Sequence, residues 1–291
     1  MIISRIKGGL GNQLFAYAAS RRLSVINNDE LLLDTYSGFS RDYKFQRKFQ
    51  LNYFKIPCKK IKPTTIFSRK LQKFISIFLP FNQKPYVQQE FDDFDKRLLA
   101  LKTKKRTVTL DGLWQSELYF ADIEDIIRNE LVFTISINNL LDDTIKLIET
   151  TESVAVHVRM FGPKGDTKNV SSEYYEKAIT YFCKTLQNPK FYLFTDNIHY
   201  ASDLLSKTNT NFINVSNTKY HQVNDVAELL IMSRCKHHII ANSTFSWWGA
   251  WLASDKNQKV IYPLPSKENN WCWNYTGQMP KHWDPIRNYE D

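Results

Sequence analysis

The residues best suited to chemistry lie between positions 241 and 252, where the chain reads Ala-Asn-Ser-Thr-Phe-Ser-Trp-Trp-Gly-Ala-Trp-Leu. The apolar residues 238–240 precede them and predict a strand. A strand that gives way to a Ser/Thr-rich turn and then to a helix presents unpaired backbone N–H groups and hydroxyls to an anion. The segment therefore predicts a binding site for a diphosphate.

Two polar residues, His157 and Arg159, end another predicted strand, 154–159. They are two positions apart, so both side chains leave the same face, at the carboxyl end where parallel sheets bind ligands. A guanidinium offers a diphosphate a planar fork of donors, worth roughly 1.5–3 kcal/mol for each charge-assisted hydrogen bond. The alternatives are an ion pair between Arg159 and a carboxylate of the other domain, and a core position for His157.

Glu228 is an acidic residue within a mainly apolar predicted helix, 223–235. A buried acid is costly unless it is paired or faces a cleft. A carboxylate that faces a cleft can accept two hydrogen bonds from guanine, one from N1–H and one from the exocyclic amine, which adenine cannot offer. A solvated position on the helix surface is the alternative, and Asp225 fits a plain N-terminal cap.

A glycine-rich loop follows the first predicted strand. Gly8, Gly9 and Gly11 are three of the nine glycines, and apolar residues with helical spacing follow them. Glycines let a ligand approach the main chain closely, although a tight turn between a strand and a helix would need them too. The glycine spacing is not the GxGxxG of dinucleotide-binding folds, and Asp34 is the only acid placed to hydrogen-bond a ribose. Both points argue against a dinucleotide site.

Strands alternate with helices along the sequence, which indicates parallel sheets covered by helices on both faces. A clear strand follows a long helical stretch near residue 150, so we expect two domains, 1–150 and 151–291. The strands expected in the second domain are 154–159, 191–196, 211–215, 238–241 and 260–263. The tryptophans of 247–251 are expected to pack a helix onto the sheet rather than to stack on a sugar.

The composition restricts the partners. The chain has 291 residues, 43% hydrophobic, and a net charge of +9, which favours phosphate-bearing or anionic partners without separating a sugar nucleotide from a nucleic acid or a lipid. Four cysteines without CxxC spacing predict reduced, buried thiols. No apolar run approaches the ~18 residues of a membrane span and no signal sequence is evident, so a cytoplasmic protein is expected.

Residues 41–105 are basic and aromatic with few clear periods. Within them a helix is predicted that ends before Pro80. Its apolar face and the cations around it are Phe67, Leu71, Phe74, Ile75 and Phe78, with Arg69, Lys70 and Lys73. Two interpretations stay open: a helix that packs on the domain, or an interfacial helix that holds the protein against anionic lipid.

Four motifs, in chain order, resemble those of the bacterial alpha-1,2-fucosyltransferases, glycosyltransferase family 11. They are GGLGNQLF at 8–15, HVR at 157–159, FTD at 194–196 and ANSTFSWWGAW at 241–251. The resemblance spans about residues 1–285. The first and last motifs carry its specificity, since either of the short ones alone would mean little.

The resemblance implies a GT-B-type α/β fold, two Rossmann-like domains with parallel sheets that face a central cleft. It implies an inverting, metal-independent transfer of L-fucose from GDP-fucose to a hydroxyl, O2 of a terminal galactose, on an oligosaccharide or lipid-linked glycan of surface polysaccharide or O-antigen synthesis. Domain 1–150 would hold the acceptor and 151–291 the nucleotide sugar. No cofactor and no nucleic acid is implied, and the charge adds an expected peripheral contact with an anionic membrane.

The same resemblance assigns roles to residues. Arg159 would hold the β-phosphate as a catalytic cation, His157 and Glu228 would face guanine, and Asn12 would lie near the sugar and the acceptor. Further residues expected to line the nucleotide sugar are Asn242, Ser243, Thr244, Phe245, Gly9 and Gly11. A protein cation would replace a metal. In keeping with this, the DxD of residues 93–95 follows no apolar strand and is interpreted as a solvated acidic turn.

The chain departs from the family after Arg159, where relatives commonly have a second arginine and a nearby acid. Lys164 could restore the charge and Asp166 the acid. Inversion needs a base within hydrogen-bond reach of the attacking hydroxyl, and spacing alone assigns none. The candidates for this base are Asp34, Asp111, Asp166 and Glu173. The alternative functions are another donor or linkage on the same fold, and a non-enzymatic basic protein that binds carbohydrate or nucleic acid.

Overall fold

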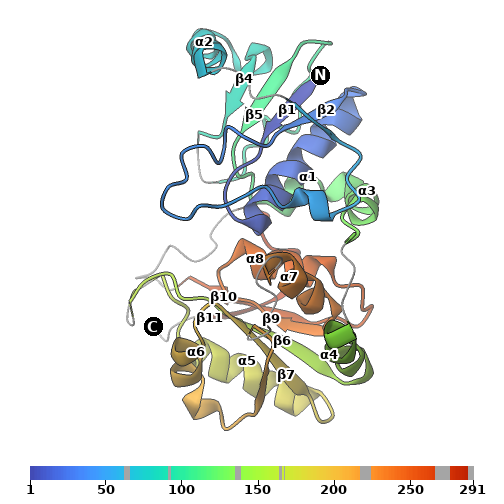
Figure 1. Cartoon of the computed structure of the whole chain (residues 1–291), viewed down its shortest axis with the longest axis vertical. Coiled ribbons are helices and arrows are strands. Elements are labelled where there is room, and N and C mark those ends of the chain that lie inside the picture. The colour runs from blue at the N-terminus through green and yellow to red at the C-terminus, as the bar shows by residue number, and fades with distance from the viewer. Residues whose placement is uncertain are drawn as a thin grey trace. The chain divides into compact units, whose positions relative to one another are not determined.

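The computed structural model describes residues 1–61, 66–90, 93–134, 139–163, 166, 168–216, 224–265 and 276–287 (Figure 1). The chain divides into two compact units, each built on one parallel sheet. The first unit comprises Met1–Thr134 and Tyr275–Met279, and the second comprises Ile135–Asn274 and Pro280–Asp291. Two parallel α/β units are the organisation that the alternation of strands and helices predicts.

The first unit contains a five-stranded sheet in the order β3-β2-β1-β5-β4. Its strands are β1 (Ile2–Arg5), β2 (Leu31–Asp34), β3 (Lys59–Lys60), β4 (Tyr86–Gln88) and β5 (Val108–Asp111). The register pairs Arg5 with Asp34 and Gln88 with Asp111. Since parallel strands end at one edge, Arg5, Asp34 and Asp111 come together at the carboxyl edge of this sheet.

The helices of the first unit are α1 (Leu10–Asn27), α2 (Ile66–Ile77) and α3 (Glu124–Glu130). Short 3₁₀ turns lie at Leu51–Tyr53, Phe81–Gln83, Glu117–Tyr119 and Ala121–Ile123. The predicted passage from strand through glycine loop to helix is present as β1, residues 6–9 and α1. Gly8 has a φ of +79°, a conformation that favours glycine, so this turn explains one glycine of the loop without a ligand.

The second unit contains a six-stranded parallel sheet in the order β11-β10-β9-β6-β7-β8. Its strands are β6 (Ser153–Val158), β7 (Lys190–Thr195), β8 (Phe212–Asn214), β9 (His237–Ile239), β10 (Val260–Leu264) and β11 (Asp284–Arg287). The first five correspond to the expected strands. The edge strand β11 has no alternating or apolar pattern that would indicate it.

Helices cover both faces of the second sheet, namely α4 (Asn139–Thr150), α5 (Ser172–Thr185), α6 (Ile198–Leu204), α7 (Asn224–Arg234) and α8 (Thr244–Leu252). Val154, Val156 and Val158 of β6 belong to one buried cluster, with residues of α5 and α6. Ala155 belongs to another, with residues of α4 and α7. The alternation along β6 therefore places His157 on the α7 face.

The division between the units falls at Thr134, whereas the sequence favours residue 150. The difference concerns α4. Its Ile145 and Ile148 lie in the buried cluster that contains Ala155 and Ile231, so the helix packs in the second unit. The sequence pattern around 150 marks the start of a strand but carries no information on which sheet the preceding helix covers.

The tryptophan cluster is part of the core, as predicted. Trp247 and Trp248 are fully buried, Trp251 is 3% exposed, and Trp283 joins them. Their ring centroids lie 5.0–6.2 Å apart. These rings fix α8 against the sheet and so fix the position of the turn that precedes it.

Cys58, Cys183 and Cys235 are free thiols. Cys235 is buried as expected, but Cys183 is exposed because it lies on the solvent side of α5, so the prediction of burial is wrong there. Cys272 lies outside the described residues. None of the helices in the described part of the chain is long and apolar enough to cross a bilayer.

Candidate active site

Three of the sequence motifs meet at the carboxyl edge of the second sheet. β6 pairs with β7 so that His157 lies opposite Phe194, and with β9 so that Val156 lies opposite Ile239. The residues that follow these neighbouring strands, 159–160, 196–197 and 240–244, consequently emerge side by side. This is the edge at which doubly wound sheets bind ligands.

Arg159 forms an ion pair with Asp196, with 3.0 Å between Nη1 and Oδ2. The backbone N–H of Met160 donates to the other carboxylate oxygen over 3.1 Å. Both partners belong to the second unit, so the alternative of a pair with the opposite domain is wrong. The side chain of Arg159 stays 38% exposed, and a guanidinium has five N–H donors, so the fork can also meet a ligand.

His157 is buried beside this pair and is uncharged. Its ring lies 5.7 Å from that of Phe245, and its carbonyl accepts a hydrogen bond from the Tyr175 hydroxyl. Burial, with the nearby Arg159 charge, lowers the pKa of His157 to about 3. Nδ1 is buried and has no hydrogen-bond partner among the described residues. An unsatisfied buried nitrogen at a ligand-binding edge is what a site for a polar ligand would leave in the free protein.

Glu228 of α7 is half-buried and connected to the end of β7. The Ser216 hydroxyl hydrogen-bonds to it and also accepts from the Thr195 N–H over 2.8 Å. Burial, and then the neighbouring Asp225 and Asp196 charges, raise the pKa of Glu228 to about 7. The alternative of a freely solvated helix surface is therefore wrong, and this carboxyl changes charge near neutral pH.

The turn 241–244 is held by its own side chains. The Ser243 hydroxyl caps α8 by accepting from the Phe245 N–H, and it can still donate its proton to an anion. The buried Asn242 amide donates to the Lys168 carbonyl over 2.8 Å. Ser243, Thr244 and Phe245 are half-buried. The first turn of α8 therefore presents N–H groups and hydroxyls at this edge, the arrangement that suits a diphosphate.

The segment after β6 is organised by Asn169, which the sequence does not single out. Its side-chain oxygen accepts from the Phe161 N–H over 2.7 Å, and its amide donates to the carbonyls of Gly162 and Pro163. Asp166 accepts from the Lys168 N–H and so forms a turn within the same segment. Lys164, expected to restore a missing charge, lies outside the described residues.

In the first unit the glycine loop is fixed by amide side chains. Buried Gln13 donates to the carbonyls of Gly8 and Lys48 and accepts from the Gln50 N–H. The Asn12 oxygen accepts from Gln115 over 2.8 Å. Gly9 caps α1 and Gly11 is buried in its first turn. Gly9, Gly11 and Asn12 thus belong to the first unit, whereas the other predicted site residues belong to the second.

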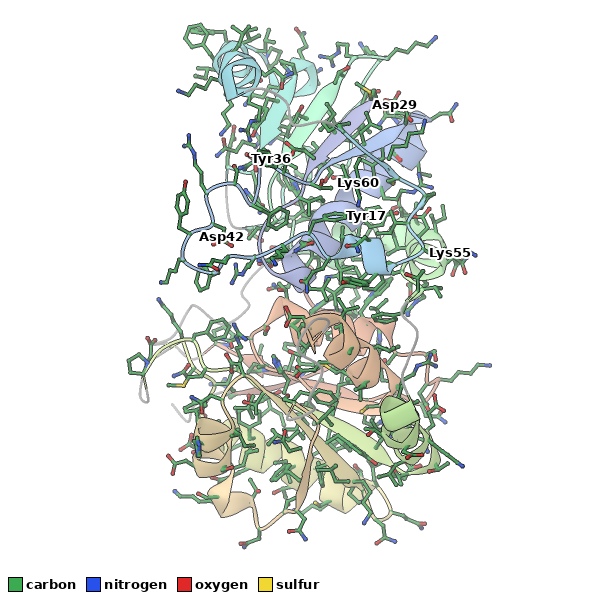
Figure 2. All side chains as sticks on the ribbon, in the orientation of Figure 1. Tyr17, Asp29, Tyr36, Asp42, Lys55 and Lys60 are labelled. Carbon is green, nitrogen blue, oxygen red and sulfur yellow. The ribbon has the colours of Figure 1, made fainter. Side chains whose placement is uncertain are left out.

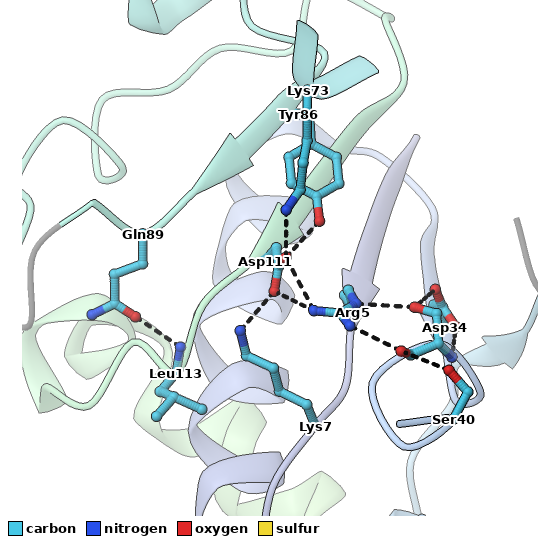
Figure 3. Close-up of polar contacts among 10 residues, drawn as sticks. Arg5, Lys7, Asp34, Ser40, Lys73, Tyr86, Gln89, Asp111 and Leu113 are labelled. Carbon is cyan, nitrogen blue, oxygen red and sulfur yellow. Dashed lines mark hydrogen bonds and ion pairs between the residues drawn. The ribbon is translucent and has the colours of Figure 1, made fainter. Parts of the chain in front are cut away.

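Asp111 is the most heavily engaged of the candidate bases (Figure 3). It accepts hydrogen bonds from Arg5, Lys7 and Tyr86, and Lys73 lies 3.9 Å away. Burial by itself would raise the pKa of Asp111, but the charge of Lys7, and then Tyr86 and Arg5, lower this pKa to about 2. So acidic a carboxyl is a poor proton acceptor at neutral pH.

The other candidate bases have structural partners. Asp34 accepts from the backbone N–H and the hydroxyl of Ser37. Figure 3 shows Asp34 beside Arg5. Glu173 lies in the first turn of α5, where a hydrogen bond from its own N–H and one from Ser171 lower its pKa. These contacts do not single out one of the four acids, and the base stays unassigned.

The DxD of residues 93–95 makes contacts that a turn would make. Asp93 accepts from the backbone N–H groups of Phe94 and Thr276, and Asp95 pairs with Arg97 over 2.7 Å. No group of His, Cys, Asp and Glu side chains within the described ranges could hold a metal ion.

Two units, each built on one parallel α/β sheet, are the organisation of the GT-B class. Residues 2–271 match the family described as Glycosyl transferase family 11, and the chain belongs to that family. The expected family and fold class are thereby confirmed.

Two relatives from Escherichia coli align over most of the chain. One is an Alpha-1,2-colitosyltransferase, 31% identical over 284 residues, covering 91% of this chain and 92% of the relative. The other is the O-antigen biosynthesis glycosyltransferase WbnK, 29% identical over 292 residues, covering 89% and 93%.

Solved structures share the fold at low identity. NodZ alpha-1,6-fucosyltransferase of Bradyrhizobium, soaked with GDP-fucose, matches with a TM-score of 0.51 and 16% identity over 87% of this chain and 92% of that one. A mutant of Arabidopsis thaliana FUT1 in complex with GDP matches with a TM-score of 0.56 and 14% identity over 92% and 71%.

Proposed function

We propose that this glycosyltransferase transfers a 6-deoxy sugar from its GDP ester to O2 of a galactose-type residue during assembly of a surface polysaccharide such as O-antigen. Family membership and the relative named as an alpha-1,2-colitosyltransferase support the linkage, and the relative named for O-antigen biosynthesis supports the setting. Colitose is L-fucose without its 3-hydroxyl, so GDP-fucose and GDP-colitose are the two donors to separate.

The observation that carries this proposal is the grouping of Arg159, His157 and Glu228 at one sheet edge. Arg159, steadied by Asp196, would bind the β-phosphate through the N–H groups that the ion pair leaves. As the bond between sugar and diphosphate breaks, negative charge grows on that phosphate and the contact strengthens. A fixed guanidinium therefore supplies the stabilisation for which other transferases use a metal.

The guanine base of the nucleotide would be recognised by residues on the α7 side of the second sheet. The Glu228 carboxylate, oriented by Ser216, would accept from N1–H and the exocyclic amine of guanine. The buried Nδ1 of His157 would take up a further polar group of the nucleotide. Ser243, Thr244 and Phe245 at the start of α8, with Asn242 holding the turn, would line the diphosphate.

The first unit would carry the acceptor, with Asn12 beside the sugar that is transferred and Gly9 and Gly11 in the adjoining loop. An inverting displacement requires the acceptor hydroxyl to lose its proton as it attacks. Asp111 is the least suited of the four candidate acids because its pKa is about 2. We place the enzyme in the cytoplasm, where nucleotide sugars are made, at the inner face of the membrane.

A donor screen tests the proposal. Release of GDP or UDP is measured for GDP-fucose, GDP-colitose, GDP-mannose and UDP-galactose with a panel of galactose-ended acceptors, with and without acceptor. Turnover with one of the first two donors, and an α-1,2 product by NMR, is expected. Turnover with UDP-galactose alone would overturn the donor assignment.

Two matched variants locate the chemistry. Arg159→Lys keeps the charge and loses the fork, so kcat should fall by roughly 10²–10³. Arg234→Lys is the control, because Arg234 is a half-exposed arginine of the same unit that is also paired, with Glu149. Equal activity of the two variants would remove Arg159 from the reaction.

A further inference from the structure

Helix α2 packs with its polar side against the first unit. Ser76 is buried, and its hydroxyl accepts from the Tyr86 N–H of β4 over 3.1 Å. Gln72 accepts from the Thr109 hydroxyl over 3.4 Å. Lys73 lies 5.1 Å from the centre of the Tyr86 ring and 3.9 Å from Asp111. Among the described side chains of α2, Ser76, Gln72 and Lys73 thus contact the sheet through polar groups.

The opposite side of the helix is apolar and exposed. We define the α2 apolar face as Leu71, Phe74, Ile75, Ile77 and Phe78, which are 49%, 59%, 40%, 72% and 71% exposed. An ordinary surface helix buries such residues and exposes its polar ones. The helix does pack on the domain, as one of the two interpretations expects, but the described residues of its apolar face stay largely exposed. Contiguous exposed apolar residues of this size mark an interaction surface.

The sequence segment that contains α2 is rich in cations. Residues 43–89 contain 11 Lys and Arg and no Asp or Glu, whereas the rest of the chain has 28 Lys and Arg against 30 acids. The whole net positive charge of the protein therefore resides in the segment that includes α2. Lys70 beside the face is exposed, and Figure 2 shows Lys55 and Lys60 of the same segment on the first unit.

We propose that the α2 apolar face docks onto an anionic lipid bilayer, with the helix lying in the plane of the interface. Apolar side chains would enter the headgroup region, and basic residues would be attracted to the negative surface. Helix α2 itself carries Arg69, Lys70 and Lys73 and no acid, which complements an anionic bilayer, whereas a second copy of this chain would bring the same positive helix to the contact. The occupant is therefore lipid.

Docking also identifies the kind of acceptor, and this step rests on the proposed function. Lys73 connects α2 to Asp111, which in turn binds Arg5 and Lys7 at the carboxyl edge of the first sheet (Figure 3). A helix fixed on the bilayer would hold that edge close to the headgroups. The acceptor that reaches it would be a glycan built on a membrane-bound lipid.

Vesicle flotation tests the docking without any enzymatic readout. Wild-type protein should float with vesicles of phosphatidylglycerol mixed with phosphatidylcholine, and much less with phosphatidylcholine alone. Combined Leu71→Ser, Phe74→Ser, Ile77→Ser and Phe78→Ser should reduce the bound fraction roughly tenfold or more. Leu147→Ser with Ile198→Ser is the control, because these residues are exposed hydrophobics of the second unit.

Two results would overturn the docking. One is wild-type protein that fails to float with anionic vesicles. The other concerns a dimer. If the wild-type protein is a dimer in solution, and the fourfold variant is folded by circular dichroism, monomeric and unchanged in flotation, the face belongs to a second copy of the chain. A charge test is Lys70→Glu against Lys184→Glu of α5, of which only the first should weaken flotation.

Activity then separates this inference from the proposed function. The fourfold variant should keep wild-type kcat on a water-soluble galactoside and lose roughly tenfold or more on the same glycan attached to a lipid in anionic vesicles. Equal loss on both acceptors would contradict the membrane-bound acceptor. Absence of turnover on every acceptor would count against the proposed function and leave the flotation result in place.

Discussion

At the scale of single residues, the candidate site depends on how burial acts on charge. Arg159 remains partly exposed and paired with Asp196, which suits a cation that must meet a charged ligand. His157 and Glu228 are both driven by burial toward their neutral forms. His157 is uncharged at any physiological pH, but Glu228, with a pKa of about 7, changes charge in the working range.

Glu228 should make the stability of the free protein pH-dependent. Its pKa rises from 4.5 to about 7 on folding, so the folded state binds the proton more tightly. The contribution of Glu228 to stability is then fully present below pH 4.5 and is lost as the pH rises through about 7. It amounts to at most about 1.4 kcal/mol per unit of pKa difference, reduced by solvent screening. The free energy of unfolding in urea at pH 5 and pH 8 measures this. In Glu228→Gln the difference should shrink.

The same residue should make GDP binding pH-dependent in the opposite sense. If the carboxylate binds guanine, GDP affinity relative to ADP should increase from pH 6 to pH 8, since phosphate ionisation is common to both ligands. Isothermal titration calorimetry should find this increase abolished in Glu228→Gln, with weaker GDP binding and unchanged ADP binding. An unchanged GDP affinity would cancel the guanine assignment.

Asp111→Asn should destabilise the first unit by about 3 kcal/mol, because Arg5 and Lys7 would remain partly buried without their carboxylate. The control is Asp122→Asn, which breaks an exposed pair with Arg22 and should cost under about 1 kcal/mol. Because the pKa of Asp111 is lowered to about 2, its contribution is present above pH 3.8 and lost as the pH falls through 2. Urea unfolding of both variants at pH 7 decides this, and equal losses would contradict it.

At the scale of elements, the segment after β6 shows how a loop next to a site is kept in one conformation. Asn169 supplies three hydrogen bonds to the backbone of residues 161–163, and Asn242, from the start of the α8 segment, binds the Lys168 carbonyl. These bonds connect the loop that follows Arg159 with the turn expected to bind diphosphate. Disorder of the loop should therefore affect donor binding.

Asn169→Ala should raise the KM for the donor several-fold and loosen the loop, because three part-buried hydrogen bonds are lost at about 1 kcal/mol each. Asn169→Asp is the matched variant, since it keeps the acceptor for the Phe161 N–H and loses the two donors. Faster hydrogen exchange of residues 160–163 and a larger rise in the KM for the donor are expected in Asn169→Ala than in Asn169→Asp. Normal exchange in the Ala variant would show that the loop is held by other contacts.

At the scale of the whole molecule, each unit carries its own parallel sheet, and the proposed chemistry relies on a protein cation in the second. Activity should therefore persist when divalent metals are removed. Turnover is measured after dialysis against EDTA and again with added manganese, with Asp93→Asn as the companion variant. A metal at residues 93–95 would be favoured if the wild-type enzyme lost activity on dialysis and regained it with manganese, while the Asp93→Asn variant did not regain it.

Much of the fold follows from patterns that are local in sequence. Strand ends such as 157–159 and 194–196 could be placed because an apolar run followed by polar residues stops a buried strand wherever it lies. The tryptophan core was predictable too, since rings after a strand pack on its sheet.

What the sequence by itself determined is therefore the set of motifs, their position at strand ends and the family to which they belong. Only the tertiary structure decided that Arg159 pairs with Asp196, that Ser216 holds Glu228, and that α4 belongs to the second unit. It also decided that α2 turns its apolar face outward. The physical reason is common to all four: periodicity shows which residues share a face, whereas the neighbour of that face is set by contacts between segments distant in the chain.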